Sequence, residues 1–271
     1  TTLFRSTLDK EHQSLHSDQL VLLDFSKAFD SVTHQRLLSK LNYYGIRDRS
    51  LDWIKAFLTD RTQVVSIIGT LSNPRPVVSE VPKWSGLGLV LFQLYVNDIT
   101  DNISSHMRLF ADDVVIYRES NTQKDHLALQ QDLDNWCKWE DLWQLSFLIT
   151  KCYHLRITSK TVPFCHDYLM NDQTTSTVTS TKYLGITLNQ KLNWNQHCDL
   201  ICSNANGTLG LLRRVLGDCT TDVKSKAYVT LVRPQLEYAS SAWNPYTNVI
   251  STRLKWFNIG QLDLCYMIIL D

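Results

Sequence analysis

The sequence predicts an α+β fold, with a mainly antiparallel sheet backed by helices. Three observations predict it. The run QLVLLDF (19–25) is almost continuously apolar, as expected of a buried strand. The stretch MRLFADDVVIY (107–117) places Ala-Asp-Asp between two apolar runs, which predicts a hairpin. From Asn121 to about Trp143, large apolar side chains recur at helical spacing.

The remaining segments are predicted from the same periodicities. Helices are expected at 33–45 (ended by Gly45), 50–58 (capped by Ser50), 85–99 (capped by Ser85), about 195–216 and about 222–243. Strands are expected in a hairpin over 63–82, turned at Ser72-Asn73-Pro74, and at 146–149, 153–158 and 182–188. Residues 171–181 are polar and predict a loop.

Composition is that of a globular protein. The 271 residues are 44% hydrophobic and 20% charged, with 27 basic and 27 acidic side chains. The charge is unevenly spread: residues 101–150 carry nine acids and four bases (net −5), and residues 201–256 carry seven bases and three acids (net +4). An acidic middle followed by a basic region suits a metal site beside a polyanion groove, although chance asymmetry explains the charges equally well.

The seven cysteines show no paired pattern. His197, Cys198 and Cys202 lie close in sequence, but no second ligand cluster completes a zinc site. No signal peptide is visible, and the late apolar run CYMIIL is too short to span a membrane. We therefore expect a reduced intracellular protein, nuclear or cytoplasmic and not secreted. A chain without an initial Met is compatible with a fragment.

Three carboxylates are expected to converge at one end of the sheet. Asp24 closes the first strand, and Asp112 and Asp113 occupy the bend of the 107–117 hairpin. Two or three carboxylates suffice to hold hard divalent cations, which retain several waters. From the residues alone, a helix cap at Asp24 and an ordinary turn at Asp112-Asp113 remain open alternatives.

Several motifs occur in order: LLDFSKAFDSVTHQRLLSKLNYYGI, VPKWSGLGLVLFQLYVNDI, LFADDVVIY, YLGITLNQKLNW and LVRPQLEYASSAWNPY. Over about residues 20–247 the chain closely resembles the reverse transcriptase of non-LTR (LINE-type) retrotransposons. This resemblance implies a right-hand polymerase, with a palm sheet backed by helices, truncated fingers and a helical thumb. It divides the chain into fingers remnant and palm (1–190), thumb-like region (191–256) and divergent tail (257–271).

The resemblance also implies roles for individual residues. Asp24, Asp112 and Asp113 would hold two Mg²⁺ ions, with Mn²⁺ as an alternative, and Lys151 would give a proton to the leaving pyrophosphate. Nucleotide contacts fall to Phe25, Phe29, Lys83 and Ser85, with Phe29 as the aromatic that excludes a ribose 2′-hydroxyl. Tyr183, Leu184 and Gly185 would support the primer end. The competing roles are a core residue for Phe29, a solvated surface residue for Lys151 and a structural role for Asp30.

Implied partners are an RNA template, a DNA primer and dNTPs, without a membrane, and the oligomeric state stays open. We expect the 195–243 region to present Arg213, Arg214, Lys224 and Lys226 to a nucleic-acid duplex, because phosphates attract clustered bases. A lowered pKa of Lys151 near the metal site would suit a general acid.

Three departures from the family pattern stand out. After Pro82 the family has Gln-Gly-Ser, whereas this chain has Lys83-Trp84-Ser85. The family's glycine and asparagine before the motif lysine are absent, and both ends diverge. If the replaced glycine uses a positive φ, Trp84 there is strained by roughly 1–2 kcal/mol.

Two functions therefore stay open: an active RNA-directed DNA polymerase, and an impaired remnant that binds nucleic acid. A metal-dependent nuclease would use similar carboxylates but explains none of the other motifs.

Overall fold

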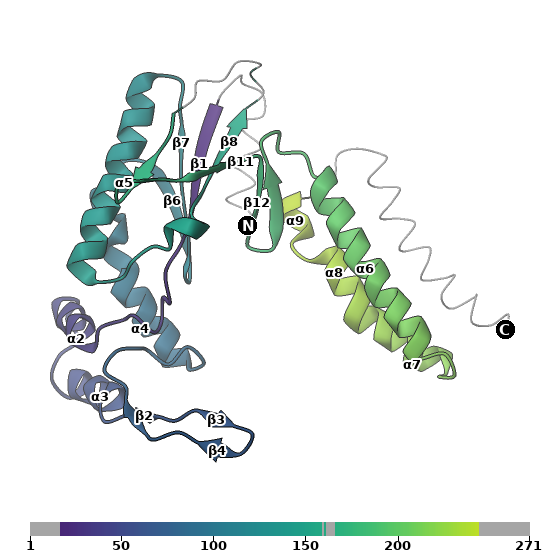
Figure 1. The fold of residues 1–271 in the computed structure, drawn as a ribbon, viewed down its shortest axis with the longest axis horizontal. Helices are drawn as coiled ribbons and strands as arrows, with labels where there is room; N and C mark the ends of the chain where they lie inside the picture. The colour runs from purple at the N-terminus through teal and green to yellow at the C-terminus, as the bar shows by residue number, and fades with distance from the viewer. Residues whose placement is uncertain (1–16, 159, 161–165, 244–271) are drawn as a thin grey trace. The chain divides into compact units, whose positions relative to one another are not determined.

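The computed structural model describes residues 17–158, 160 and 166–243 (Figure 1). The chain forms two compact units. Among the described residues, the sheet unit comprises 17–156, 160 and 166–178, and the helical unit comprises 157–158 and 179–243. The predicted domain boundary at 190 stays a prediction, and the predicted tail 257–271 lies outside the described residues. Within the described ranges, no helix combines the length and apolar character needed to cross a membrane.

The sheet unit is built on five strands in the order β11-β8-β1-β7-β6. Their bounds are β1 (Ser17–Asp24), β6 (His106–Phe110), β7 (Asp113–Glu119), β8 (Tyr153–Thr158) and β11 (Ser176–Val178). Strand β7 pairs antiparallel with both β1 and β6, and β11 runs parallel to β8. The predicted α+β fold with a palm-like sheet is confirmed. Strand β1 lies inside the sheet, which explains its continuous apolar run.

Helices α4 (Gly86–Val96) and α5 (Gln123–Trp143) run beside this sheet (Figure 1). Helix α5 begins with a capping box between Thr122 and Asp125, which satisfies the first backbone N–H groups of the helix. Its apolar face buries Leu129, Leu133 and Trp136 in the main core. Full burial of side chains this large stabilises the fold by about 1.5–3 kcal/mol each.

Helices α2 (His34–Tyr43) and α3 (Asp48–Leu58) lie between β1 and β6 along the chain. Gly45 follows α2 with φ +89°, which confirms it as the stop signal. The cap predicted at Ser50 is wrong, because α3 begins two residues earlier, after Arg47. The buried ammonium of Lys40 holds α2 in place: it bonds Asp98 Oδ1 at 2.5 Å and lies 3.6 Å from the Trp143 ring centroid.

The predicted 63–82 hairpin is turned at a different place. It consists of β2 (Thr62–Gln63) paired with β5 (Arg75–Pro76), and β3 (Ser66–Ile67) paired with β4 (Thr70–Leu71). Ile68 and Gly69 form the turn, both with positive φ, as a type I′ hairpin requires. The Ser72 N–H instead donates to the Val65 carbonyl, and its Oγ accepts from the Val65 N–H, so the predicted turn at Ser72-Asn73-Pro74 is wrong.

Two further predictions need correction. The polar run 171–181 is not a loop: it contributes β10 (Gln173–Thr174), paired with β9 (Leu169–Met170), then β11 and the start of β12 (Ser180–Tyr183). Its threonines are β-branched and suit an edge strand despite their polarity. Residues 146–149 make only an isolated bridge, Phe147 with Phe25, before a 3₁₀ turn at Ile149–Lys151.

The helical unit contains the hairpin of β12 and β13 (Ile186–Asn189), and then α6 (Asn195–Val215), close to its predicted bounds. The second predicted long helix is broken into α7 (Thr221–Ala227), a π-helical segment (Tyr228–Val232), α8 (Arg233–Glu237) and α9 (Ser240–Trp243). Pro234 explains one break, because proline has no N–H for a continuous helix and its ring clashes with the preceding turn.

Candidate active site

The strand register brings Asp24 and Asp113 together. Asp24 is the last residue of β1 and pairs directly with Asp113, the first residue of β7. Asp113 also pairs with Phe110 of β6, so Ala111 and Asp112 form a two-residue hairpin loop. The backbone thus gathers all three predicted metal ligands at one end of the sheet.

The bend itself is strained. Ala111 has φ +53° at the first position of the loop, where glycine is the usual residue in a type II′ turn. An L-residue in this region costs roughly 1–2 kcal/mol. Strain of this kind persists where the surrounding structure fixes the backbone, and here the paired strands β6 and β7 fix it.

The carboxylates disfavour one another's charge. The pKa of Asp113 is raised above its usual value by partial removal from water, and further by Asp112 and Asp24. Asp113 remains exposed, so solvent reduces the energy of this repulsion. A divalent cation between the carboxylates would reverse the sign of these interactions and favour the ionised forms.

Lys151 is the cation that the structure places here. Its Nζ donates to Asp24 Oδ2 at 2.9 Å, and the two side chains are 59% and 29% exposed. The backbone helps to position it, because the Leu148 N–H donates to the Asp24 carbonyl and the Lys151 N–H to the Leu148 carbonyl. The hydrogen bond to Asp24 raises the pKa of Lys151, which is opposite to the lowering that was expected.

The donor set fits a hard divalent cation in chemical type, since carboxylate oxygens are the ligands that Mg²⁺ prefers. The backbone brings the three residues together, but their side chains are not grouped as metal ligands. Among the described residues, no three His, Cys, Asp or Glu side chains are grouped closely enough to hold a metal ion. In the structure Asp24 Oδ2 accepts from Lys151.

Two of the predicted nucleotide contacts are core residues in this structure. Phe25 and Phe29 are each 3% exposed. Phe25 stacks on Phe147 with ring centroids 4.5 Å apart, and Phe29 stacks on Phe92 at 4.4 Å. Their burial favours the structural alternative for Phe29, while its nucleotide role stays a prediction.

The loop from Pro82 to Gly88 differs from expectation in its backbone. Trp84 is 96% exposed and is not among the described residues with positive φ, so the strain suggested for it is absent. Ser85 is confirmed as the N-cap of α4, because its Oγ accepts from the Gly88 N–H at 2.9 Å. A Cβ at Gly88 would lie 2.0 Å from the Pro82 carbonyl oxygen, which explains why glycine is required there. Lys83 extends toward the core, with Nζ 5.3 Å from the Phe29 ring centroid.

The predicted primer-supporting residues form a tight turn in the helical unit. Tyr183 ends β12, and Leu184 and Gly185 have φ +47° and +78°, which is the type I′ pattern. The Tyr238 hydroxyl donates to the Leu184 carbonyl at 3.2 Å. A Cβ at Gly185 would lie 3.1 Å from the Tyr238 ring, so glycine lets that ring cover the turn.

The four basic residues predicted to face a duplex do not share one environment. Arg213 and Arg214 are exposed at the end of α6, and Lys226 is exposed but paired with Asp222 at 2.7 Å. Lys224 is only 6% exposed, and its Nζ donates to the Gly217 carbonyl at 2.8 Å. Lys224 therefore holds the chain just after α6, and its predicted exposure is wrong.

His197 and Cys198 are buried in the helical unit. Burial raises the pKa of Cys198 to about 11. The expectation of no zinc at these residues and Cys202 stays a prediction. His197 uses Nδ1 to accept from the Thr187 N–H at 3.3 Å and packs against Trp243.

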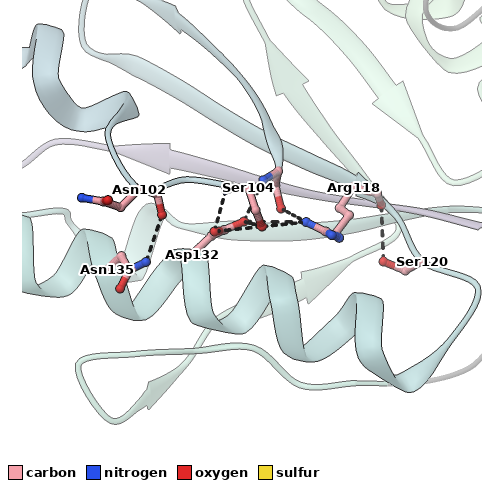
Figure 2. Close-up of polar contacts among 7 residues, drawn as sticks. Asn102, Ser104, Arg118, Ser120, Asp132 and Asn135 are labelled. Carbon is pink, nitrogen blue, oxygen red and sulfur yellow. Dashed lines mark hydrogen bonds and ion pairs between the residues drawn. The ribbon is translucent and has the colours of Figure 1, made fainter.

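Sequence reasoning missed Asp132. This residue lies on the apolar face of α5 between Leu129 and Leu133 and is 2% exposed. Its carboxylate faces Ser104 and Arg118 (Figure 2). A charged residue inside an apolar helical stripe was the available signal, because ionised side chains are buried only when other groups compensate their charge.

The chain was compared with known proteins. The family described as reverse transcriptase (RNA-dependent DNA polymerase) matches residues 2–188. The probable RNA-directed DNA polymerase from transposon BS of Drosophila melanogaster is 28% identical over 82% of this chain and 26% of its own length. The RNA-directed DNA polymerase from mobile element jockey of the same species is 30% identical over 65% of this chain and 20% of its own length.

Among solved structures, telomerase from Candida albicans with a fragment of telomeric RNA matches with a TM-score of 0.48 and 10% identity, over 98% of this chain and 46% of that one. The chain spans about a quarter of the length of the curated relatives it matches. Because the family match covers well over half of its residues, the chain belongs to the reverse transcriptase family, as a domain of the non-LTR (LINE-type) retrotransposon kind.

Proposed function

We propose that this chain catalyses RNA-templated DNA synthesis, in which the 3′-hydroxyl of a DNA primer attacks a dNTP and pyrophosphate leaves. The observation that carries the proposal is the pairing of Asp24 with Asp113 beside Asp112. Lys151 pairs with Asp24, while Asp112 and Asp24 disfavour the charge of Asp113. This mutual repulsion suits a site that is completed by a divalent metal ion.

The chain's own groups have separable roles in this proposal. Asp24, Asp112 and Asp113 would hold Mg²⁺ or Mn²⁺, and such ions supply activation of the attacking hydroxyl and charge stabilisation at the leaving group. Lys151 holds a proton at Nζ within reach of the same site, which supports it as the proton donor to pyrophosphate. The hydrogen bond to Asp24 raises the pKa of Lys151 above its usual value, so Nζ carries its proton at neutral pH.

The helical unit is proposed to bind the template–primer duplex. Arg213 and Arg214 are exposed together at the end of α6, where they are available to contact phosphates. Replacing both with Gln should lower the affinity for an RNA–DNA duplex. The slope of log affinity against log salt should become shallower by about 1–2, because binding releases fewer counterions when fewer phosphates are contacted. A Lys226→Gln variant is the control, since Asp222 already pairs with that side chain.

Primer extension on an RNA template, with and without Mg²⁺, tests the polymerase directly. We expect extension that requires Mg²⁺ and falls by roughly a hundredfold or more in Asp112→Ala, the range seen when one group that stabilises developing charge is removed. The matched control is Asp134→Ala, which removes an exposed carboxylate from α5. Extension that survives Asp112→Ala would contradict the proposal.

A second candidate is an impaired polymerase that binds nucleic acid without efficient synthesis. The exposed indole of Trp84 favours it, because the family has glycine there. The ammonium of Lys83 also only donates hydrogen bonds, whereas the family's glutamine both donates and accepts.

Restoring the family's residues distinguishes the two candidates. If the loop limits synthesis, Lys83→Gln with Trp84→Gly should raise primer extension with little change in stability, because Trp84 is exposed and its backbone is unstrained. Trp53→Ala is the control for loss of an exposed indole. Strong extension by the unaltered chain, without improvement in the double variant, would rule out the second candidate.

A further inference from the structure

One face of α5 is bonded along the segment that joins α4 to β6. Positions 132, 135, 136 and 139 lie on the same side of the helix, because they are three or four residues apart. Each meets a successive part of the 98–105 segment: Trp139 Nε1 donates to Asp98 Oδ1 (2.9 Å), Trp136 Nε1 to the Ile99 carbonyl (2.9 Å) and Asn135 Nδ2 to the Asn102 carbonyl (3.1 Å). Asp132 makes the last contact of the series, with Ser105, the residue directly before β6.

Asp132 accepts a set of bonds that fixes the backbone at this point (Figure 2). Its Oδ1 accepts from the Ser104 N–H and its Oδ2 from the Ser105 N–H, both at 2.9 Å. The Ser104 hydroxyl donates to Oδ2 at 3.1 Å. Hydrogen bonds to a charged acceptor are about twice as strong as neutral ones, and the burial of Asp132 keeps water from replacing them.

Arg118 connects this cluster to the other strand of the hairpin. It lies on β7, the strand that begins with Asp113. Its Nη1 donates to the hydroxyls of Ser104 at 2.9 Å and Ser105 at 3.1 Å, and it lies 4.0 Å from Asp132 Oδ2. Both strands of the β6–β7 hairpin are thus tied together at the end opposite Asp112 and Asp113.

This anchor matters because β6 is an edge strand. In the described sheet β6 is bonded to β7 alone, and no strand supports its outer side. Edge strands open and slip more readily than central ones. The contact at Asp132 supplies the restraint that a second neighbouring strand would otherwise give.

We infer that Asp132 is a positioning residue for the paired carboxylates: by fixing the start of β6 and, through Arg118, the end of β7, it holds the hairpin whose bend carries Asp112 and Asp113. The inference rests on the proposed function for what those carboxylates bind. The backbone that Asp132 binds at Ser105 is separated from the bend by about 20 Å of strand, at some 3.3 Å per residue. Asp132 therefore acts through the backbone and touches no reacting group.

Hydrogen exchange followed by mass spectrometry, together with Mn²⁺ binding followed by electron paramagnetic resonance, tests this inference on the whole chain. The variant is Asp132→Asn, which keeps the side-chain shape but places an N–H group against a backbone N–H. The control is Asp134→Asn, the same change on the exposed side of α5.

In Asp132→Asn we expect exchange to rise at least about tenfold more over 104–117 than over 17–23, since the lost anchor permits local opening of the hairpin in addition to any loss of stability of the whole unit. We also expect the apparent Mn²⁺ dissociation constant to rise several-fold. Asp134→Asn should change neither. A residue that only stabilised the whole unit would raise exchange in β1 as much as in the hairpin and would leave the affinity of the folded protein unchanged.

If Asp132→Asn does not fold, Ser104→Ala decides, because it removes one hydroxyl and leaves both backbone bonds to Asp132. We expect a smaller rise in exchange over 104–117 in that variant. Unchanged exchange in a folded Asp132→Asn, or in Ser104→Ala when the first variant fails, overturns the inference. Faster hairpin exchange without weaker Mn²⁺ binding also overturns it. If the unaltered chain binds no Mn²⁺, exchange confined to the hairpin supports the anchor and counts against the proposed function.

Discussion

The β6–β7 hairpin has carboxylates at both ends, and their surroundings are opposite. At one end Asp132 is buried and accepts hydrogen bonds from two backbone N–H groups and a hydroxyl, with Arg118 nearby. At the other end Asp113 is exposed, and its charged form is disfavoured by Asp112 and Asp24.

The difference shows how one strand pair can both stabilise the fold and carry a reactive group. A compensated carboxylate strengthens the fold in which it is buried, whereas a carboxylate repelled by its neighbours weakens the fold until a cation arrives. Stability and function are therefore placed at separate ends of the same element. Mutations at the two ends should have effects of opposite sign.

The largest effect is expected from Asp132→Asn. The change replaces one of the two carboxylate oxygens that accept from the Ser104 and Ser105 N–H groups by an NH₂ group. Leaving one buried N–H without its charged acceptor costs about 3 kcal/mol. The measurement is the free energy of unfolding of the sheet unit in urea, followed by tryptophan fluorescence.

Asp134→Asn serves as the reference for this measurement, because Asp134 is exposed and its Oδ1 accepts from the Gln130 side chain of the same helix. A loss below about 0.5 kcal/mol in Asp132→Asn would equal that of an ordinary surface substitution. The comparison between the two ends of the hairpin would then be broken.

Acid pH should destabilise the folded chain through His154, a buried side chain that is neutral, in contrast to the two carboxylates. His154 is 0% exposed, and its Nε2 lies 2.7 Å from Gln19 Oε1 on β1. Burial, and then Arg156, His126 and His166, lower the pKa of His154 to about 4. The folded chain thus keeps His154 neutral, while the unfolded chain protonates it below about pH 6.5.

The stability that neutral His154 contributes is fully present above pH 6.5 and is lost as the pH falls toward 4. Over this window the loss amounts to as much as about 3 kcal/mol, at 1.36 kcal/mol per pKa unit. In His154→Gln the free energy of unfolding should fall less steeply with acid. His106→Gln removes an exposed histidine and should keep the steep fall. Equal slopes in both variants would refute this expectation.

The sequence allowed the fold class, the carboxylate pair and the N-cap Ser85 to be predicted, because each depends on a local pattern. The meeting of Asp24 with Asp113 was predicted from their places at the ends of apolar runs, although β1 is buried on both faces and has no alternating pattern that would set its register. Errors arose where a tertiary contact overrides local preference. Lys224 was predicted to be an exposed base, but in the structure its ammonium is buried and donates to the Gly217 carbonyl.

Other errors have equally specific causes. The threonine-rich 171–181 segment was predicted as a loop from its polarity, yet β8 offers Ser176–Val178 a neighbouring strand. Asp132 was overlooked because the N–H groups that donate to its carboxylate belong to Ser104 and Ser105, 28 and 27 positions away. Contacts at that separation leave no periodic signature in the sequence.

The smallest effect concerns Asp113 itself. Asp113→Asn should raise the free energy of unfolding at neutral pH by less than about 1 kcal/mol, since solvent screens this exposed group. The sign follows from the raised pKa of Asp113. The stability that this group contributes is fully present below the ordinary pKa of an aspartate, and it is lost as the pH rises through the raised value. The variant and the unaltered chain should therefore be equally stable near pH 3 and diverge above it. Added Mg²⁺ should then stabilise the unaltered chain more than Asp113→Asn, because ligands that bind the folded state shift its equilibrium. A variant less stable than the unaltered chain at neutral pH would mean that the bend is held together, as Asp132 holds the other end, and the contrast between the two ends would disappear.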